Sequence, residues 1–412
     1  MILRAKYLLP NSLQVIENGA LVIHGSQIAE VGTYEAVKRG NDSEVRDLGE
    51  VVIMPGLVNA HTHLELTHHQ DLIQRTSRFT DWLSQLIRNH KSDSEWVDSA
   101  VKDGIEMSAA GGATTVGDIH GFGMSAHSHR NSPVRTVVFF ETTGFSPERT
   151  HIGVERIDEY LAASPQKDAL FQPAVSPHAL YSTSAALYRY CLRLAQSRGL
   201  PLCTHLSETK DEIEFLASGT GAFADLLKAF GISMKEWTPP GCSPIQYLKD
   251  IGILEYRPLL AHCNYLTEAD IETLAASNAT VVFCPRAHHY FHHNSHPICR
   301  LIKAGANVAI GTDSLASNWS LSMLDELKYL ANTQDGLSPH TIVDLVTING
   351  ARGLSLNRVG KLEKGWYADV IGVAIPDDGQ SVIQQILDES ARIILTIVAG
   401  QICFDQGAQR DN

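Results

Sequence analysis

The chain has 412 residues, enough for one large domain or two to three ordinary ones, and its 44% apolar and 19% charged residues are typical of a soluble globular protein. Its formal net charge of −13 disfavours nucleic acid or an anionic membrane as the main partner. No apolar run approaches the roughly 18 residues that a membrane span needs, and the seven scattered cysteines form no Cys-x-x-Cys pair, which argues against a disulfide scaffold or thiolate zinc cage and favours a reducing cytoplasm.

The two ends of the chain share a β-rich pattern. Residues 1 to about 54 alternate polar and apolar residues, turn at Asn18-Gly19 and His24-Gly25, and lack the apolar core of a signal peptide. The stretch from 366 to 412 is again strand-like with glycine turns. We therefore expect residues 1–54 and 366–412 to form one small β-sandwich domain around a middle domain of residues 55–365.

Short apolar runs recur along the middle of the chain. They begin at Val51, Gly112, Val134, Leu170, Pro201, Arg257, Ala279 and Ala306. Helical-looking stretches separate most of them, and continuous rather than alternating apolar runs favour strands buried on both faces of a parallel sheet. Eight strand–helix units predict an α/β protein with a (β/α)8 TIM barrel. The competing doubly wound sheet lacks its Gly-x-Gly-x-x-Gly turn.

The first run ends in "PGLVNAHTHLEL", with His61 and His63 one residue apart. In an extended strand, residues i and i+2 point to the same face, so the two imidazoles would converge. The pair is either half of a metal site or two partly buried histidines bonded to backbone carbonyls. The motif alone leaves both readings open.

Other apolar runs also end in histidine or an acid. The fourth, fifth, sixth and eighth give His178, His205 with Glu208, His262 and Asp313. Each residue alone has a structural explanation: Asp313 could cap a helix, and Glu208 could be a first-turn acid. In a barrel, however, the carboxyl ends of the strands carry the chemistry. Their joint appearance there favours a metal site.

Five segments resemble the signature segments of the amidohydrolase superfamily: "PGLVNAHTHLEL", "SPHALYS", "THLSET", "AHCNYLT" and "GTDSLASN". They are most similar to its aminohydrolase branch, which includes adenosylhomocysteine, methylthioadenosine and guanine deaminases. The late "NGARGLSLNRVGKLEKGWYADVIG" resembles the family's return to its small β domain. The resemblance implies a cytoplasmic, metal-dependent hydrolase of carbon–nitrogen bonds in cyclic amidines, with a small heterocyclic substrate and a homodimeric state.

The resemblance also implies a ligand set. Carried over by motif, His61, His63, His205 and Asp313 bind one divalent metal. Members with two metals have a carboxylated lysine at the end of the fourth strand, where this chain has "AVSPHALYS" and no lysine. Three imidazoles and a carboxylate suit Zn2+ and would tolerate Fe2+ or Mn2+.

Catalytic roles follow from the same resemblance. Metal-bound hydroxide attacks the amino-bearing ring carbon, and ammonia leaves. Glu208 shuttles protons to the ring and to the leaving amine, and Asp313 takes the proton of the attacking water. His262 orients or stabilises the developing hydroxyl, and His178 contacts the substrate near the leaving group.

The seventh run departs from the family pattern. Adenosine-type deaminases continue Cys-Pro-x-Ser-Asn, whereas this chain has "CPRAHHYFHHNSH". The stretch His288 to His296 is either a solvated loop or a substrate wall in which His289 contacts substrate and Arg286 receives an anion; the sequence does not decide. "GTDSLASNWSLSMLDELK" and "FTDWLSQLI", with Trp82 as an aromatic lid, are most similar to bacterial aminodeoxyfutalosine deaminases of menaquinone biosynthesis. That substrate is an adenine nucleoside bearing a benzoate.

Three functions therefore stand side by side. The first is deamination of an aminopurine nucleoside, with aminodeoxyfutalosine first and adenosylhomocysteine, methylthioadenosine, adenosine or guanine as alternatives. The second is removal of a chlorine or alkylamine from an aromatic heterocycle, which Glu208 disfavours because an amine leaving group is what demands ring protonation. The third is a non-catalytic binding or assembly protein, which the intact ligand set disfavours.

Overall fold

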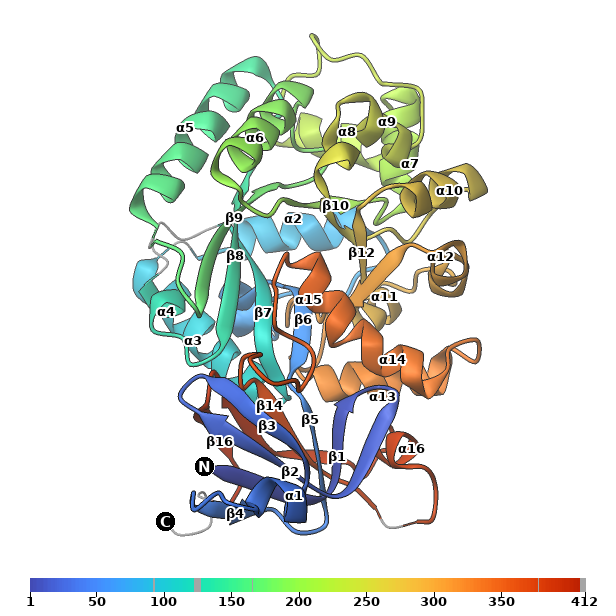
Figure 1. Ribbon diagram of the computed structural model, residues 1–412. Helices are drawn as coiled ribbons and strands as arrows, with labels where there is room; N and C mark the ends of the chain where they lie inside the picture. The colour runs from blue at the N-terminus through green and yellow to red at the C-terminus, as the bar shows by residue number, and fades with distance from the viewer. Residues whose placement is uncertain (92, 122–126, 165, 377, 408–412) are drawn as a thin grey trace.

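The computed structural model describes residues 1–91, 93–121, 127–164, 166–376 and 378–407. Its centre is a closed barrel of parallel strands in chain order (Figure 1). These strands are β6 (Leu57–Thr62), β7 (Ala113–His120), β8 (Arg135–Thr142), β9 (Phe171–Pro177), β10 (Cys203–Leu206), β11 (Leu259–His262), β12 (Thr280–Phe283) and β13 (Asn307–Ile310). Bridges from Val175 to Leu202 and from Thr62 to Asp313 join the two halves. The predicted TIM barrel is confirmed.

Alternate residues of the barrel strands enter different parts of the core. In β8, Val137 and Phe139 belong to a small cluster built mainly from barrel strands, whereas Val138 and Phe140 pack in the large cluster shared with the helices. Both sets are almost fully buried. A strand enclosed on both faces is therefore apolar throughout, which is why the runs in the sequence are continuous.

Helices surround the barrel and connect its strands. They are η1 (Leu64–His69), α2 (Phe79–Asn89), α3 (Ser94–Ala110), α4 (His127–Arg130), α5 (Pro147–Ala163), α6 (Ala185–Arg198), α7 (Lys210–Ser218), α8 (Ala222–Ala229), α9 (Pro244–Asp250), η2 (Ile253–Tyr256), α10 (Glu268–Ala276), α11 (Pro285–Tyr290), α12 (Ile298–Ala304), α13 (Met323–Thr333), α14 (Pro339–Leu345) and α15 (Ile348–Gly353). Side-chain caps such as Ser146 on α5 and Ser184 on α6 accept the first free amide hydrogens and fix where these helices begin. Within the described ranges, no helix combines the length and apolarity that crossing a membrane would need.

A second sheet joins the two ends of the chain below the barrel (Figure 1). It contains β1 (Ile2–Asn11), β2 (Gln14–His24), β3 (Gln27–Thr33), β4 (Val45–Asp47), β5 (Val51–Pro55), β14 (Val370–Ala374), β15 (Arg392–Val398) and β16 (Gln401–Asp405), with the short helices α1 (Tyr34–Lys38) and α16 (Val382–Ile386) beside it. The antiparallel pairing of β5 with β14 connects the N-terminal to the C-terminal strands. The two ends of the chain therefore pair as expected, and the sandwich-like sheet is confirmed. The domain boundaries, between residues 54 and 55 and between residues 365 and 366, stay a prediction.

The first apolar run is two strands, not the single one expected. β5 belongs to the small sheet and β6 to the barrel, and Gly56 lies between them. A Cβ at Gly56 would lie 2.1 Å from Oγ1 of Thr114, so no larger residue fits this crossing. Both strands are fully buried, so apolarity alone gave no sign of the break.

Candidate active site

Three strand ends bring four side chains to one point. The Nε2 atoms of His63 and His205 lie 3.2 Å apart. Oδ1 of Asp313 lies 3.8 Å from Nε2 of His61 and 3.7 Å from Nε2 of His63. The His61 ring lies 5.0 Å from each of the other two rings, centroid to centroid. Two nitrogen ligands of one tetrahedral zinc ion lie roughly 3.3 Å apart. Ligand atoms of His61, His63 and Asp313 all lie within 4.8 Å of one another, and His205 adjoins this group through His63.

The backbone at these strand ends adopts a left-handed conformation that non-glycine residues rarely take. Its φ is 49° at Ser207, 72° at His262, 52° at Cys263 and 58° at Asp313. At Asp313 the strain is held by hydrogen bonds: its N–H donates to the His61 carbonyl at 3.1 Å, and Oγ1 of Thr62 donates to its carbonyl at 2.9 Å. Such strain concentrates where a chain must aim functional side chains.

The clustered histidines are neutral. Burial, followed by the neighbouring imidazoles, lowers the pKa of His61 and His63 well below the usual range, and burial lowers that of His205 to about 4. A metal ligand must be the neutral imidazole. Nδ1 of His205 donates to the carbonyl of His178 at 3.1 Å, which leaves its Nε2 facing His63 as the ligand atom.

Glu208 is a buried acid that stands beside this cluster. Its Oε1 lies 3.6 Å from Nε2 of His262. Burial, then the charges of Asp313 and Glu212, raises the pKa of Glu208 well above the usual range. Burial likewise raises the pKa of Asp313 to about 6, although the hydrogen bond from Ser317 opposes this shift. The two carboxyls thus differ in acidity, as a proton donor and a proton acceptor should.

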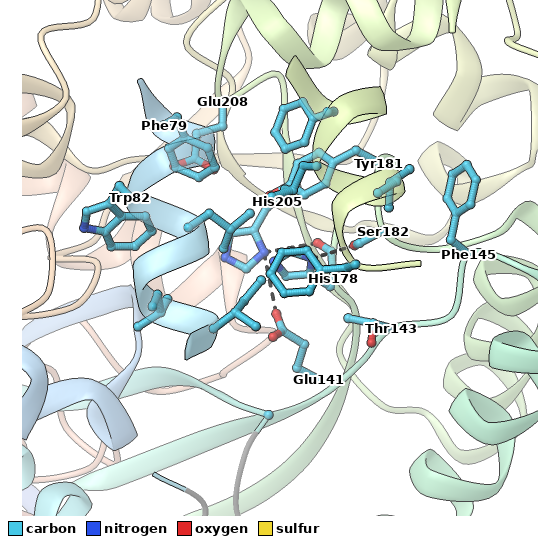
Figure 2. A pocket seen from close by; sticks show the side chains of 18 of the residues that line it. Phe79, Trp82, Glu141, Thr143, Phe145, His178, Tyr181, Ser182, His205 and Glu208 are labelled. Carbon is cyan, nitrogen blue, oxygen red and sulfur yellow. Dashed lines mark hydrogen bonds and ion pairs between the residues drawn. The ribbon is translucent and has the colours of Figure 1, made fainter. Parts of the chain in front are cut away.

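These groups form the floor of a cavity of about 360 Å³ (Figure 2). Its walls are largely apolar, with Leu83, Leu86 and Ile87 from α2 and Leu226 and Leu227 from α8. Figure 2 shows Phe79 and Trp82 on one side of the His205 ring and Tyr181 on the other. Of the residues expected at the site, the structure places in this cavity His63, Trp82, His178, His205, Glu208, His262 and Asp313, while the buried His61 lies behind them.

The structure does not bring Arg286 or His289 into the cavity. Arg286 is buried, its Nε donates to Oδ1 of Asn318 at 3.1 Å, and its guanidinium pairs with Asp325 at 3.3 Å and Glu326 at 3.4 Å. His289 is exposed on the surface. The expectation that Arg286 receives a substrate anion is therefore corrected. Its guanidinium is already paired with two carboxylates of α13, and these ion pairs join α11 to α13.

The histidine-rich stretch is solvated in part and does not line the cavity: His289 and His292 are exposed, whereas His296 is buried. Nε2 of His296 donates to the His262 carbonyl at 2.9 Å, and its ring stacks on Phe283 with centroids 3.9 Å apart. Nδ1 of His293 bonds to the Tyr265 hydroxyl at 3.0 Å. Through the hydrogen bond of His296, the buried end of this stretch supports the strained backbone of His262 at the end of β11.

Six polar residues of the cavity were not anticipated: Glu141, Thr143, Arg149, Arg156, Ser182 and Ser314. Oε1 of Glu141 lies 3.7 Å from Nδ1 of His205, and burial, then the charge of Glu65, raises the pKa of Glu141 to about 8. Glu141 ends the third barrel strand, so the strand-end rule that found Glu208 applies to it as well. The arginines lie on α5, where no strand pattern could reveal them.

Comparisons with known proteins agree with this geometry. The model of the amidohydrolase family matches residues 52–403. A 5-methylthioadenosine/S-adenosylhomocysteine deaminase of Thermodesulfovibrio yellowstonii is 30% identical over 90% of this chain and 84% of its own. A 5′-deoxyadenosine deaminase of Methanothrix thermoacetophila is 30% identical over 79% of this chain and 74% of its own.

Two solved structures share the fold. An adenosine deaminase from Xanthomonas campestris with bound zinc superposes with a TM-score of 0.82 at 25% identity, covering 98% of this chain and 93% of that one. The Helicobacter pylori aminofutalosine deaminase in complex with methylthio-coformycin gives a TM-score of 0.84 at 23% identity, covering 97% and 99%. At such identity the second likeness speaks for the fold alone.

Proposed function

This chain belongs to the amidohydrolase family, and on that premise we propose that it is a metal-dependent deaminase of adenine nucleosides. It is a hydrolase of carbon–nitrogen bonds in cyclic amidines. The observation that carries the proposal is the buried carboxyl of Glu208 next to His262, in a cavity that is also lined by His63, His205 and Asp313. The deaminase names of the relatives support the same reaction.

The residues present fit a single divalent ion in the cavity. Neither ring nitrogen of the fully buried His61 has a hydrogen-bond partner among the described residues, and an uncompensated buried polar group is costly. His61, His63, His205 and Asp313 would hold the ion, and three imidazoles with one carboxylate suit zinc. When bound, such an ion lowers the pKa of water from about 15.7 to about 7 and so supplies the nucleophile at neutral pH.

The chain's own groups would then move the protons. Glu208, protonated because it is buried, donates to the ring nitrogen next to the amino-bearing carbon. The Asp313 carboxylate would accept the first proton of the attacking water. The Glu208 carboxylate would then take the proton of the new hydroxyl and pass it to the departing amine, and the proton held on Asp313 would return Glu208 to its acid form. His262, held by His296 through its carbonyl, donates a hydrogen bond to the oxygen that forms. His178 faces the substrate from the end of β9.

For the particular substrate we propose aminodeoxyfutalosine, and with it a role in menaquinone biosynthesis. The apolar walls from α2 and α8 suit an aromatic tail, and Arg149 and Arg156 offer the cavity the positive charge that a tail carboxylate needs. Arg149 is exposed and makes no ion pair with any part of the chain that the structure describes. It therefore replaces Arg286 as the proposed anion receptor. A cytoplasmic location and a homodimeric state belong to this proposal.

A second candidate is deamination of methylthioadenosine, adenosylhomocysteine or 5′-deoxyadenosine. The names of the relatives favour it, and the apolar walls would also accept a thioether tail. Purified protein loaded with zinc should release ammonia from adenine nucleosides and not from guanine or a chlorinated triazine. Fastest turnover of aminodeoxyfutalosine supports the first substrate, and fastest turnover of methylthioadenosine the second. If no adenine nucleoside releases ammonia, the proposed function is wrong.

A further inference from the structure

A second group of metal-ligating side chains lies outside the cavity. Asp118 and His120 come from the end of β7, and His129 comes from α4. One ligand atom of each lies within 4.8 Å of those of the other two. All three side chains are at most 1% exposed, and none of them lines the cavity.

The ring geometry of this group repeats that of the cluster in the cavity. The His120 and His129 rings lie 5.1 Å apart with an interplanar angle of 78°. The corresponding values for His61 and His63 are 5.0 Å and 86°. In both groups two imidazoles at a steep angle to each other lie within ligand distance of one aspartate, as two nitrogen ligands and one oxygen ligand of an ion would.

A carboxylate stands behind one of the imidazoles, where metal sites usually have one. Oε2 of Glu65 lies 3.2 Å from Nδ1 of His120, and Oε1 of Glu65 accepts the N–H of Gly121 at 2.9 Å. A ligating histidine almost always gives its other ring nitrogen to a carboxylate or carbonyl, which fixes the tautomer. Glu65 thus leaves Nε2 of His120 as the ligand atom.

The charges of the group also favour a bound cation. Glu65 and Asp118 bring two carboxylates to a place that water does not reach. The nearby Arg156 donates to the Gly121 carbonyl and to the Tyr160 hydroxyl instead. Two carboxylates with two neutral imidazoles balance one divalent ion.

We propose that Asp118, His120 and His129 bind a second divalent metal ion, with zinc as the best match, and that this ion is structural. Oδ2 of Asp118 and Nε2 of His129 are 2.5 Å apart, so they must separate by about 1 Å to share a tetrahedral ion. The other oxygen, Oδ1 of Asp118, accepts the N–H of Leu64 at 2.8 Å. The ion would therefore tie the segment directly after His63 to β7 and hold the first pair of cavity ligands in place.

The experiment counts metal ions and locates them. Protein reconstituted with zinc chloride and dialysed should hold two zinc ions per chain by elemental analysis, and a crystal should give two anomalous peaks at the zinc edge. The variant with His61→Ala and Asp313→Ala should keep one ion, and His129→Gln should keep only the ion in the cavity. The matched control is His69→Gln, which should keep both ions. His69 is equally buried and stacks on His90, and among the described residues it belongs to no group with metal-ligand spacing.

A single anomalous peak in the unaltered protein would overturn the second site, whatever the variants do, and would leave the cluster as hydrogen-bonded pairs. Two ions in His129→Gln would overturn it as well. So would loss of the second ion in Glu141→Gln, because that ion would then belong to Glu141, His178 and His205, which also lie within ligand distance of one another. The deaminase proposal is unaffected by these outcomes, since it needs only the ion in the cavity.

Discussion

At the scale of single residues, the side chains proposed to do the chemistry and the side chain proposed to choose the substrate come from different elements of the fold. The imidazoles and acids of the floor come from strand ends, whereas Arg149 comes from the first turns of α5. A charge on a helix can change without disturbing the barrel. Substrate choice is therefore expected to depend on α2, α5 and α8 rather than on the floor.

Replacement of Arg149 tests the proposed anion receptor. Arg149→Ala should lower kcat/KM for aminodeoxyfutalosine by about tenfold, because a hydrogen bond to a charged group is worth about 1.5 kcal/mol or more. The value for adenosine, which has no carboxylate, should stay the same. Arg189→Ala, an exposed arginine on α6 outside the cavity, is the matched control. Equal losses for both substrates would give Arg149 a structural role.

The sequence predicted the floor of the cavity better than its walls. The alternation of side chains along a strand was enough to place His61 and His63 together, and the barrel geometry gathered His205 and Asp313 around them. The role of Arg286 was mispredicted because its partners, Asn318 and Glu326, lie more than 30 residues away in the sequence. Only the fold shows that they bind its guanidinium and keep it from a substrate anion.

At the scale of elements, Arg286 joins α11 to α13. Arg286→Ala should lower the free energy of unfolding by about 3–5 kcal/mol, since it leaves the fully buried Glu326 without its ion partner. The exposed pair of Arg300 and Glu268 provides the control, and Arg300→Ala should cost no more than about 1 kcal/mol. Chemical denaturation measures both. Similar losses in the two variants would contradict the structural role of Arg286.

Helix α7 carries a pH-dependent contribution to stability. Burial raises the pKa of Glu212 to about 7, so the folded protein holds a proton that the unfolded chain releases near pH 4.5. The stability that this proton supplies is fully present below pH 4.5 and is lost as the pH rises through 7. At about 1.4 kcal/mol per pKa unit, the loss is at most about 3.5 kcal/mol.

Glu212→Gln should therefore flatten the fall in unfolding free energy between pH 4.5 and pH 7. Glu214→Gln, an exposed acid on the same helix, should leave the slope unchanged. Denaturation curves at several pH values give the comparison. An unchanged slope in Glu212→Gln would show that Glu212 is ionised in the folded protein.

At the scale of the whole molecule, the sequence predicted the order of the barrel strands but not the point where the chain passes from the small sheet into the barrel. All eight apolar runs contain a barrel strand, because strands buried on both faces leave a continuous apolar signal. The break at Gly56 was hidden, since β5 and β6 are equally buried in two different sheets. The ion pair of Arg135 with Asp369, buried between the barrel and the small sheet, was equally invisible because its partners are far apart in the chain.

The central claim is that the barrel places the buried carboxyl of Glu208 where it can pass protons during deamination. Glu208→Gln keeps the size of the side chain but cannot shuttle a proton. We expect this variant to bind as much zinc as the unaltered protein and to deaminate its best nucleoside 10²–10⁴ times more slowly, the usual contribution of such a group. The decisive measurement is kcat with metal content determined on the same sample. Turnover near the unaltered rate with full metal occupancy would contradict the account and reduce Glu208 to an acid at the start of α7.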